Sequence, residues 1–214
     1  MLAYKFLDEE FGLKTLRERR MKISTLDDLN DPFELLPYNM KDKNLRRALQ
    51  NTRKEIGRNR GILCFSADWR DPVVWAHYAR KHFGFCFGFE VPDEVCKRIR
   101  YVTERLPFPM APVLADADAV IFTKYANWQY EQEIRIWAAL DEKEDGLYFS
   151  KFSEQLRLVK VIAGARCAVS RQEIEGALGS LADDVTLARA RAGFTKFEIV
   201  KDKLGFRQDT QRDV

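Results

Sequence analysis

The stretch from Gly61 to Glu90, GILCFSADWRDPVVWAHYARKHFGFCFGFE, constrains the fold of this chain more than any other segment. Two short apolar runs, GILCFS and FGFCFGF, stand on either side of VVWAHYARK. Asp71 suits a helix N-cap, Pro72 suits the first helical position, and Gly84 suits the point where a helix ends. Because the apolar runs are short and rich in branched and aromatic residues, the stretch predicts a strand, a helix and a second strand in succession.

Short segments of both kinds recur along the chain, which favours an α+β fold. Strands are expected at residues 2–7, 22–24, 101–104, 128–137, 158–163 and twice between 185 and 200. Helices are expected at residues 12–21, 41–60, 92–100 and 170–181. The prediction is one domain over residues 1–206, with a mixed or antiparallel sheet of short strands flanked by helices. Residues 207–214, RQDTQRDV, are expected to form a flexible tail.

Charge and apolar content point to a cytoplasmic protein that does not enter membranes. The formal net charge is +3, which is mild for a dedicated nucleic-acid binder. The N-terminal segment turns acidic at Asp8 and does not resemble a signal peptide, and the apolar runs are too short to cross a bilayer. The four cysteines show no CxxC spacing, so we expect reduced thiols and no metal site.

The segment WQYEQEIRIW, residues 128–137, carries the first candidate for chemistry. Read as a strand, it places Glu131, Glu133 and Arg135 on one face, with adjacent carboxylates about 7 Å apart. One interpretation is a solvent-wetted sheet face with a local ion pair. The other is the wall of a cleft, which the tryptophans at both ends of the segment favour.

A second candidate lies in the strand–helix–strand stretch. Ser66 stands where the first strand ends, and Trp75 and Tyr78 share one face of the following helix. These two rings can line a ligand site, or they can simply pack on the sheet while His77 makes a structural hydrogen bond. The sequence contains no GxSxG motif and no phosphate-binding glycine loop.

The segment NDPFE, residues 30–34, predicts a turn in which Asn30 or Asp31 could brace a pocket loop. The basic helix expected at residues 41–60 is interpreted as a solvated face, since no aromatic residues alternate with its charges. A metal-dependent nuclease that uses Asp31, Glu131 and Glu133 remains a further alternative.

In its ordered motifs the chain resembles a family described as domain of unknown function 2971. These motifs are a YKF start, NDPFE, CFSADWRDPVVWAHYARKHFGFCFGF and WQYEQEIRI, and the later IAG turn also fits. The resemblance spans about residues 4 to 165. It implies a shared fold and a bacterial source.

More distantly, the chain is similar to ADP-ribosyltransferases, which implies a split sheet and NAD as the substrate. The similarity would place Tyr4 and Lys5 at the ribose or phosphates, although Lys5 stands where these enzymes have arginine or histidine. Ser66 would support the site, Glu133 would hold a ribose hydroxyl and stabilise an oxocarbenium-like transition state, and Glu131 would engage the acceptor.

The same similarity extends to the cofactor-binding residues. Nicotinamide would stack on Trp75 or Tyr78, Arg135 would bind the pyrophosphate, and His77 would belong to the same site. The leading hypothesis is therefore an ADP-ribosyltransferase-like enzyme or NAD glycohydrolase, acting as a toxin or phage-defence effector by analogy. Its partners would be a nucleotide and a macromolecular acceptor, with nucleic acid less favoured. The first alternative is a non-catalytic ligand-binding or interaction module of the same fold.

Overall fold

The computed structural model describes residues 1–107 and 114–206, and it confirms the predicted α+β class. Contacts gather the chain into two compact units. Among the described residues, unit 1 is formed by Met1–Arg20, Ser66–Val91 and residues 151–206, and unit 2 by Met21–Phe65 and the described part of residues 92–150. The extent of one domain over residues 1–206 stays a prediction, and the expected tail, residues 207–214, lies outside the described residues.

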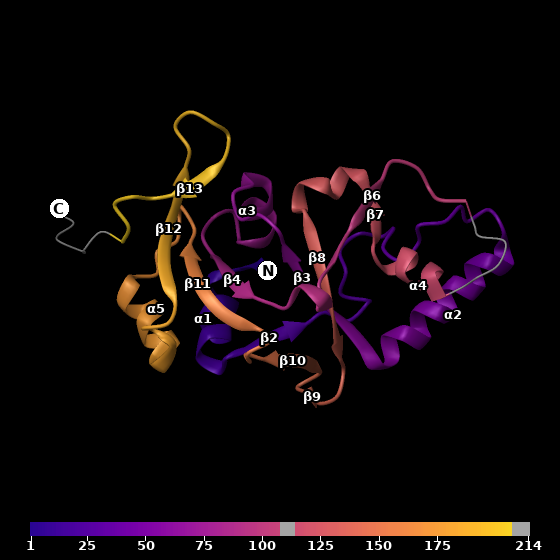
Figure 1. Cartoon of the computed structure of the whole chain (residues 1–214), viewed down its shortest axis with the longest axis horizontal. Helices are drawn as coiled ribbons and strands as arrows, with labels where there is room; N and C mark the ends of the chain where they lie inside the picture. The colour runs from indigo at the N-terminus through magenta and orange to yellow at the C-terminus, as the bar shows by residue number, and fades with distance from the viewer. Residues whose placement is uncertain (108–113, 207–214) are drawn as a thin grey trace. The chain divides into compact units, whose positions relative to one another are not determined.

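Unit 1 contains strands and helices drawn from three parts of the chain. Its elements are β1 (Leu2–Leu7), α1 (Glu9–Glu18), α3 (Pro72–Tyr78), β4 (Phe85–Glu90), β11 (Arg157–Ala163), α5 (Arg171–Leu178), η3 (Gly179–Leu181), β12 (Thr186–Ala192) and β13 (Ile199–Lys201). The strands lie in the order β13–β12–β11–β4–β1 (Figure 1). β11 and β12 are parallel, while β4 is antiparallel to both β1 and β11, so the sheet is mixed.

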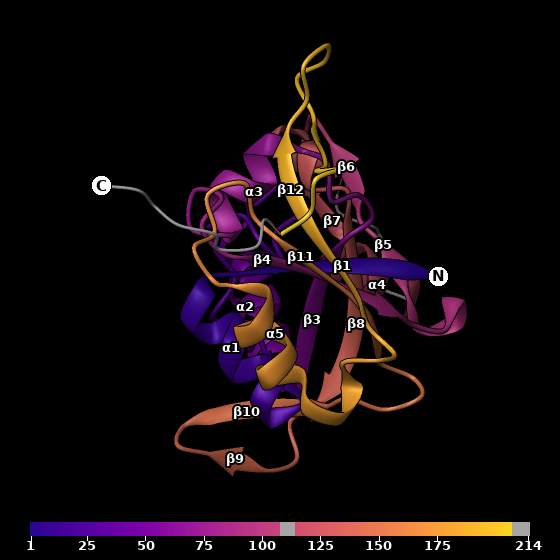
Figure 2. The same ribbon diagram turned by 90° about the vertical axis from the view of Figure 1, so that its left-hand side faces the viewer.

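Helices α1 and α3 cover opposite faces of this sheet. A Cβ atom on Gly12 of α1 would lie 2.4 Å from the ring of Phe85, so α1 is pressed closely against that side of β4. On the other side, the Trp75 ring of α3 meets the ring of Phe6 edge to face at 5.2 Å. Phe6 pairs with Cys86, the residue after Phe85, and successive strand side chains point to opposite faces. Figures 1 and 2 both show α5 beside α1.

Unit 2 is built around shorter strands. Its elements are β2 (Arg20–Ile23), α2 (Lys43–Asn59), β3 (Arg60–Ser66), η1 (Asp93–Val95), β5 (Lys97–Arg98), β6 (Arg100–Val102), α4 (Leu114–Ile121), β7 (Thr123–Tyr125), η2 (Ala126–Glu131), β8 (Glu133–Ala139), β9 (Lys143–Glu144) and β10 (Leu147–Lys151). β8 lies between β3 and β5, β10 lies between β2 and β9, and β6 pairs in parallel with β7. A buried apolar cluster that includes Leu26, Leu49, Ile62 and Phe122 forms the core.

Two expected elements are wrong. Residues 92–100 form a short 3₁₀ turn and strand β5 in place of a helix. The expected strand over residues 128–137 begins only at Glu133, because η2 occupies the first part and Gln132 turns the chain in the left-handed region at φ 44°. Among the helices that the structure describes, none is long and apolar enough to cross a membrane.

Candidate functional site

Five charged side chains of unit 2 are buried together and are called the ion cluster below: Glu34, Lys124, Glu131, Glu133 and Arg135. The Lys124 ammonium is its centre. Lys124 Nζ donates to Glu131 Oε2 at 2.6 Å and to Glu133 Oε2 at 3.1 Å. It also lies 3.5 Å from Glu34 Oε1. One lysine therefore contacts carboxylates from three separate segments.

The guanidinium of Arg135 is the second cation of the cluster. Its Nε donates to Glu133 Oε1 at 2.7 Å, and its Nη2 donates to Glu34 Oε1 at 2.6 Å. Its Nη1 donates to the carbonyl oxygen of Ile121 at 2.6 Å. The side chain is 1% exposed, so these contacts take the place of water.

Local structure explains how the acids meet Lys124. Glu133 and Arg135 stand two positions apart on β8 and therefore share a face. Glu131 ends η2, and the turn at Gln132 brings it back toward the same ammonium. A straight strand would hold the two carboxylates about 7 Å apart. The interpretation of this segment as a solvent-wetted face is wrong, because Glu133 is 4% exposed.

The cluster sets the protonation of Glu133 and Lys124. Burial alone would raise the pKa of Glu133, but Arg135 and Lys124 hold it below its usual value, so the carboxylate is ionised at neutral pH. Burial alone would lower the pKa of Lys124, but the surrounding glutamates raise it. Tyr101 Oη accepts the backbone N–H of Glu133 at 2.8 Å, and burial raises the pKa of this phenol to about 12.

Acidic groups outnumber basic groups in the interior of unit 2. Its buried charged side chains, among the described residues, are the members of the ion cluster and Asp31, which makes four carboxyl groups against two cations. Within that described part of the chain, Asp31 Oδ2 and Glu34 Oε2 are buried without a hydrogen-bond partner. Burying such atoms costs free energy, so the interior favours any group that brings positive charge.

Replacing Asp31 with asparagine is expected to raise the free energy of unfolding by about 1 kcal/mol, because it removes an unpaired buried charge. The amide can still accept the Phe33 N–H, which Asp31 Oδ1 accepts at 2.9 Å. Asp31→Ala removes the same charge but also leaves the Phe33 N–H without its acceptor, so it is expected to be about 1–2 kcal/mol less stable than Asp31→Asn. Thermal unfolding of both variants measures the two shifts. Equal destabilisation by both would mean that the fold requires the charge itself.

A cavity of about 360 Å³ lies in unit 2 and is lined in part by Lys124. Phe33 and Tyr125 also line it, and their side chains are 54% and 43% exposed. The rest of the lining is a mixture of apolar, hydroxyl and charged residues: Leu36, Pro37, Val102, Thr103, Glu104, Arg105 and Thr123. Aromatic surface with a few polar groups is typical of small-molecule sites, and this volume suits one ring system with an attached sugar.

The loop that carries Phe33 is held in place by specific contacts. Asp31 braces its backbone through the Phe33 N–H, as expected for the NDPFE turn. Arg105 donates to the carbonyl oxygens of Leu36 at 2.7 Å and Tyr38 at 3.1 Å. The Arg105 guanidinium also lies 5.3 Å from the centre of the Phe33 ring. These contacts fix one aromatic wall of the cavity before any ligand binds.

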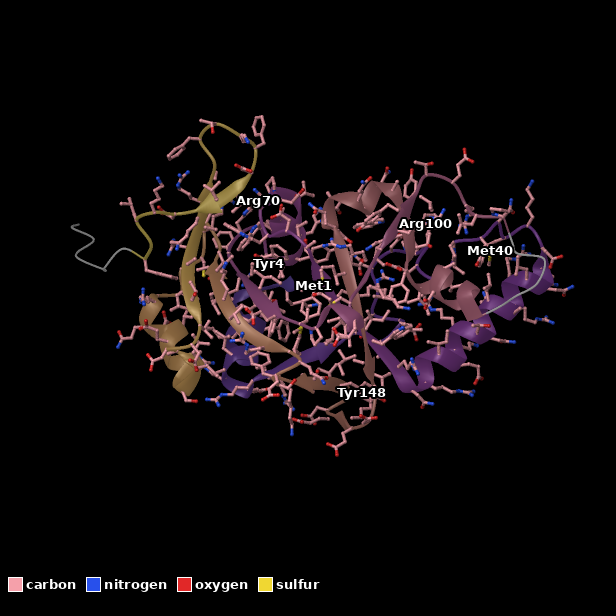
Figure 3. All side chains as sticks on the ribbon, in the orientation of Figure 1. Met1, Tyr4, Met40, Arg70, Arg100 and Tyr148 are labelled. Atoms are coloured by element: carbon pink, nitrogen blue, oxygen red, sulfur yellow. The ribbon has the colours of Figure 1, made fainter. Side chains whose placement is uncertain are left out.

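Asn30 lies in unit 2 beside Asp31, and the remaining predicted site residues lie in unit 1. Tyr4, labelled in Figure 3, pairs with Ser66 on the neighbouring strand, and directly paired residues point to the same face of a sheet. Lys5 follows Tyr4 and points to the opposite face, so it does not join Ser66. The Ser66 hydroxyl donates to the carbonyl oxygen of Asp68 at 2.7 Å and accepts the Asp68 N–H at 3.2 Å. It therefore shapes the turn after β3.

The helix α3 uses its aromatic residues mainly for packing. Trp75 is fully buried, and its indole N–H donates to the carbonyl oxygen of Trp69 at 2.6 Å. This is the packing role that the sequence left open. His77 and Tyr78 lie closer to the surface, with ring centres 6.0 Å apart and edge to face. The predicted contact of Trp75 or Tyr78 with nicotinamide stays a prediction.

Three functional candidates were not found from the sequence: Lys124, Glu34 and Tyr125. Lys124 and Tyr125 come from the segment FTKY, which has no motif around it. Glu34 ends the NDPFE turn, and its sequence neighbours do not indicate its partner Arg135, which lies far along the chain. The Lys124 ammonium stands among three of the carboxylates, and no metal-binding group of histidine, cysteine, aspartate or glutamate occurs among the described residues.

No protein-family model, curated protein or solved structure matches the chain. The similarities to domain of unknown function 2971 and to ADP-ribosyltransferases therefore stay predictions. A ligand can therefore be inferred only from the chemistry of the ion cluster and of the cavity beside Lys124.

Proposed function

We propose that the cavity of unit 2 binds a small molecule with a planar, positively charged ring, and that this ligand is the nicotinamide ribose of NAD. The observation that carries the proposal is one side chain, Lys124, that both lines the cavity and holds the buried carboxylates. A ligand in the cavity therefore lies next to an interior with an excess of acidic groups.

The aromatic wall supports this choice of ring. Nicotinamide in NAD is a pyridinium cation, and cations are attracted to the faces of aromatic rings. Phe33 and Tyr125 offer such faces on the cavity wall. Arg105 is exposed beside them and can pair with the ligand's phosphates.

The reaction proposed is hydrolysis of the nicotinamide–ribose bond. The carbon–nitrogen bond breaks, its electron pair stays on the ring nitrogen, and nicotinamide leaves as a neutral molecule. Positive charge develops on the ribose, and the ionised carboxylate of Glu133 stabilises it through the field of the site. Water then attacks the anomeric carbon and releases a proton, which gives ADP-ribose.

Release of nicotinamide from NAD by the purified protein tests the proposal. Glu133→Gln removes the charge and is expected to lower kcat about a hundredfold. Tyr125→Ala changes an exposed side chain and is expected to raise the dissociation constant for NAD about three- to tenfold. Phe11→Ala, which removes an exposed ring from α1, is the matched control and should leave both values unchanged.

Circular dichroism of each variant shows whether it is folded. Glu133→Gln can disturb the ion cluster and so lose activity for a structural reason. Tyr125 is not a member of the cluster, so NAD binding by Tyr125→Ala tests the proposal separately. Wild-type protein that neither releases nicotinamide nor is stabilised against heat by NAD would refute it.

A non-catalytic ligand-binding module is the second candidate, and one observation favours it. Both carboxylate oxygens of Glu133 are engaged, one by Arg135 and the other by Lys124 and Arg135. Such a carboxylate can tune the charge of the cavity without taking part in a reaction. Stabilisation by NAD without nicotinamide release, together with weaker binding in Tyr125→Ala, would select this candidate over the enzyme.

A further inference from the structure

The loop between β12 and β13, residues 193–198, exposes two phenylalanines almost completely. Phe194 is 88% exposed and Phe197 is as exposed as an isolated residue, at 103%. Both views of the ribbon show this loop at the far end of its hairpin, clear of the other elements of unit 1 (Figures 1 and 2). Two bare rings on one short loop are unusual, because soluble proteins keep contiguous apolar surface small unless it is used.

The loop is an ordered turn. Gly193 N–H donates to the carbonyl oxygen of Glu198 at 2.8 Å, which closes its base. A Cβ atom on Gly193 would lie 2.8 Å from the carbonyl oxygen of Lys196, so the turn requires glycine there. Ile199 N–H donates to the carbonyl oxygen of Arg70 at 2.8 Å, and Figure 3 places Arg70 at the foot of this hairpin. The hairpin therefore holds its tip outward.

Basic residues surround the two rings. The Arg191 guanidinium lies over the Phe194 ring, 4.2 Å from its centre. Lys196 stands between the phenylalanines, and Lys201 and Lys203 follow on the returning side. From residue 189 to residue 203 there are five lysines and arginines against two acids. One of these acids, Glu198, lies 3.9 Å from Arg70, so its charge is offset, and Arg191 and Lys196 are the cations beside the two rings.

We propose that this loop docks on an anionic phospholipid surface. Phe194 and Phe197 enter the boundary between headgroups and acyl chains, while Arg191 and Lys196 contact lipid phosphates. Contact of this kind needs no membrane-spanning helix. It is independent of the nicotinamide hypothesis, because all the residues that carry it belong to unit 1.

The size of the tip favours a lipid surface over a protein groove. Two phenylalanine rings bury roughly 150–250 Å² each. A stable protein interface needs about 800 Å² from each partner, which is beyond the reach of this loop alone. A bilayer requires no matching pocket, and its negative charge complements the basic rim.

Sedimentation of the full chain with vesicles tests the proposal. Wild-type protein is expected to bind vesicles of phosphatidylcholine with phosphatidylglycerol about tenfold or more tightly than vesicles of phosphatidylcholine alone. Replacing Phe194 and Phe197 together with alanine should weaken binding to the anionic vesicles about tenfold or more. Lys196→Glu should weaken it as well, whereas Phe11→Ala, another exposed ring, should bind as wild type.

The variants change exposed side chains, and circular dichroism checks that they are folded. Two results would overturn the proposal. One is failure of the wild-type protein to sediment with anionic vesicles, or equally tight binding of these vesicles by the variant that lacks both rings. The other is a wild-type protein that is a dimer in light scattering and does not bind vesicles, while the double variant is a monomer. That result would identify a second copy of the chain as the partner.

Discussion

Replacing Arg135 with alanine is expected to lower the free energy of unfolding by about 3–5 kcal/mol, the usual cost of removing one partner from a buried ion pair. Arg135 is 1% exposed, and its guanidinium donates hydrogen bonds to Glu133, to Glu34 and to the carbonyl oxygen of Ile121. The variant leaves both carboxylates in the interior but removes one of the two cations that pair with them, so that Lys124 alone remains. Urea unfolding followed by circular dichroism measures the loss.

Arg157→Ala is the matched control. Arg157 pairs with Glu90, and both side chains are at least half exposed. Exposed ion pairs contribute little to stability, so this variant should unfold nearly as wild type does. A loss in Arg135→Ala no larger than that in Arg157→Ala would contradict a structural role for the ion cluster.

Acid should narrow the difference between wild type and Arg135→Ala. The pKa of Glu133 is lowered in the fold, because Arg135 and Lys124 outweigh the effect of burial. A carboxylate with a lowered pKa stabilises the fold above its unfolded-state pKa, and this stabilisation is lost as the pH falls through the folded-state pKa. The difference in unfolding free energy should therefore shrink below about pH 4.3. A difference that is independent of pH would instead assign the loss to packing of the arginine stem.

Replacing Trp75 with alanine should cost about 3–5 kcal/mol, as deletion of a large buried aromatic ring does. The ring is fully buried, meets Phe6 edge to face and stacks on His82 with centres 6.1 Å apart. Trp75→Phe keeps one ring in the core and loses the hydrogen bond to the Trp69 carbonyl oxygen and part of the indole's buried volume, so it should cost less than the alanine variant. Thermal unfolding ranks the two variants.

Val73→Ala on the same helix is the control, because Val73 is 41% exposed and should tolerate the change. A Trp75→Ala protein that has normal stability but is no longer stabilised against heat by NAD would contradict the packing role of Trp75. That result would support the ligand contact predicted from the sequence.

Local signals made α3 and the strands before and after it predictable. Asp71 caps α3 as expected, accepting the N–H groups of Val73 at 2.7 Å and Val74 at 3.2 Å. The apolar runs before and after this helix form β3 and β4. Each of these features depends on residues that are neighbours in the sequence, which is the range over which caps, breakers and alternation act.

The candidate site was predictable only in part, because its contacts are not local. The shared face of Glu133 and Arg135 follows from strand alternation, and their ion pair could be expected. The role of Lys124 depends on β7 lying near the turn at Gln132, and neither feature has a sequence signal. The burial of Glu34 depends on Arg135, about a hundred residues away along the chain. The sequence therefore indicated two acids and an arginine without the lysine that connects them.

The position of β4 matters while the chain is being made. This strand, FCFGFE, is buried between β1 and β11, and β11 begins only at Arg157. On a ribosome that adds about 5–20 residues per second, one edge of β4 stays without its partner for roughly 3–15 s. An unpaired aromatic strand edge is a template for pairing with other chains, so the nascent protein is most open to aggregation during that interval.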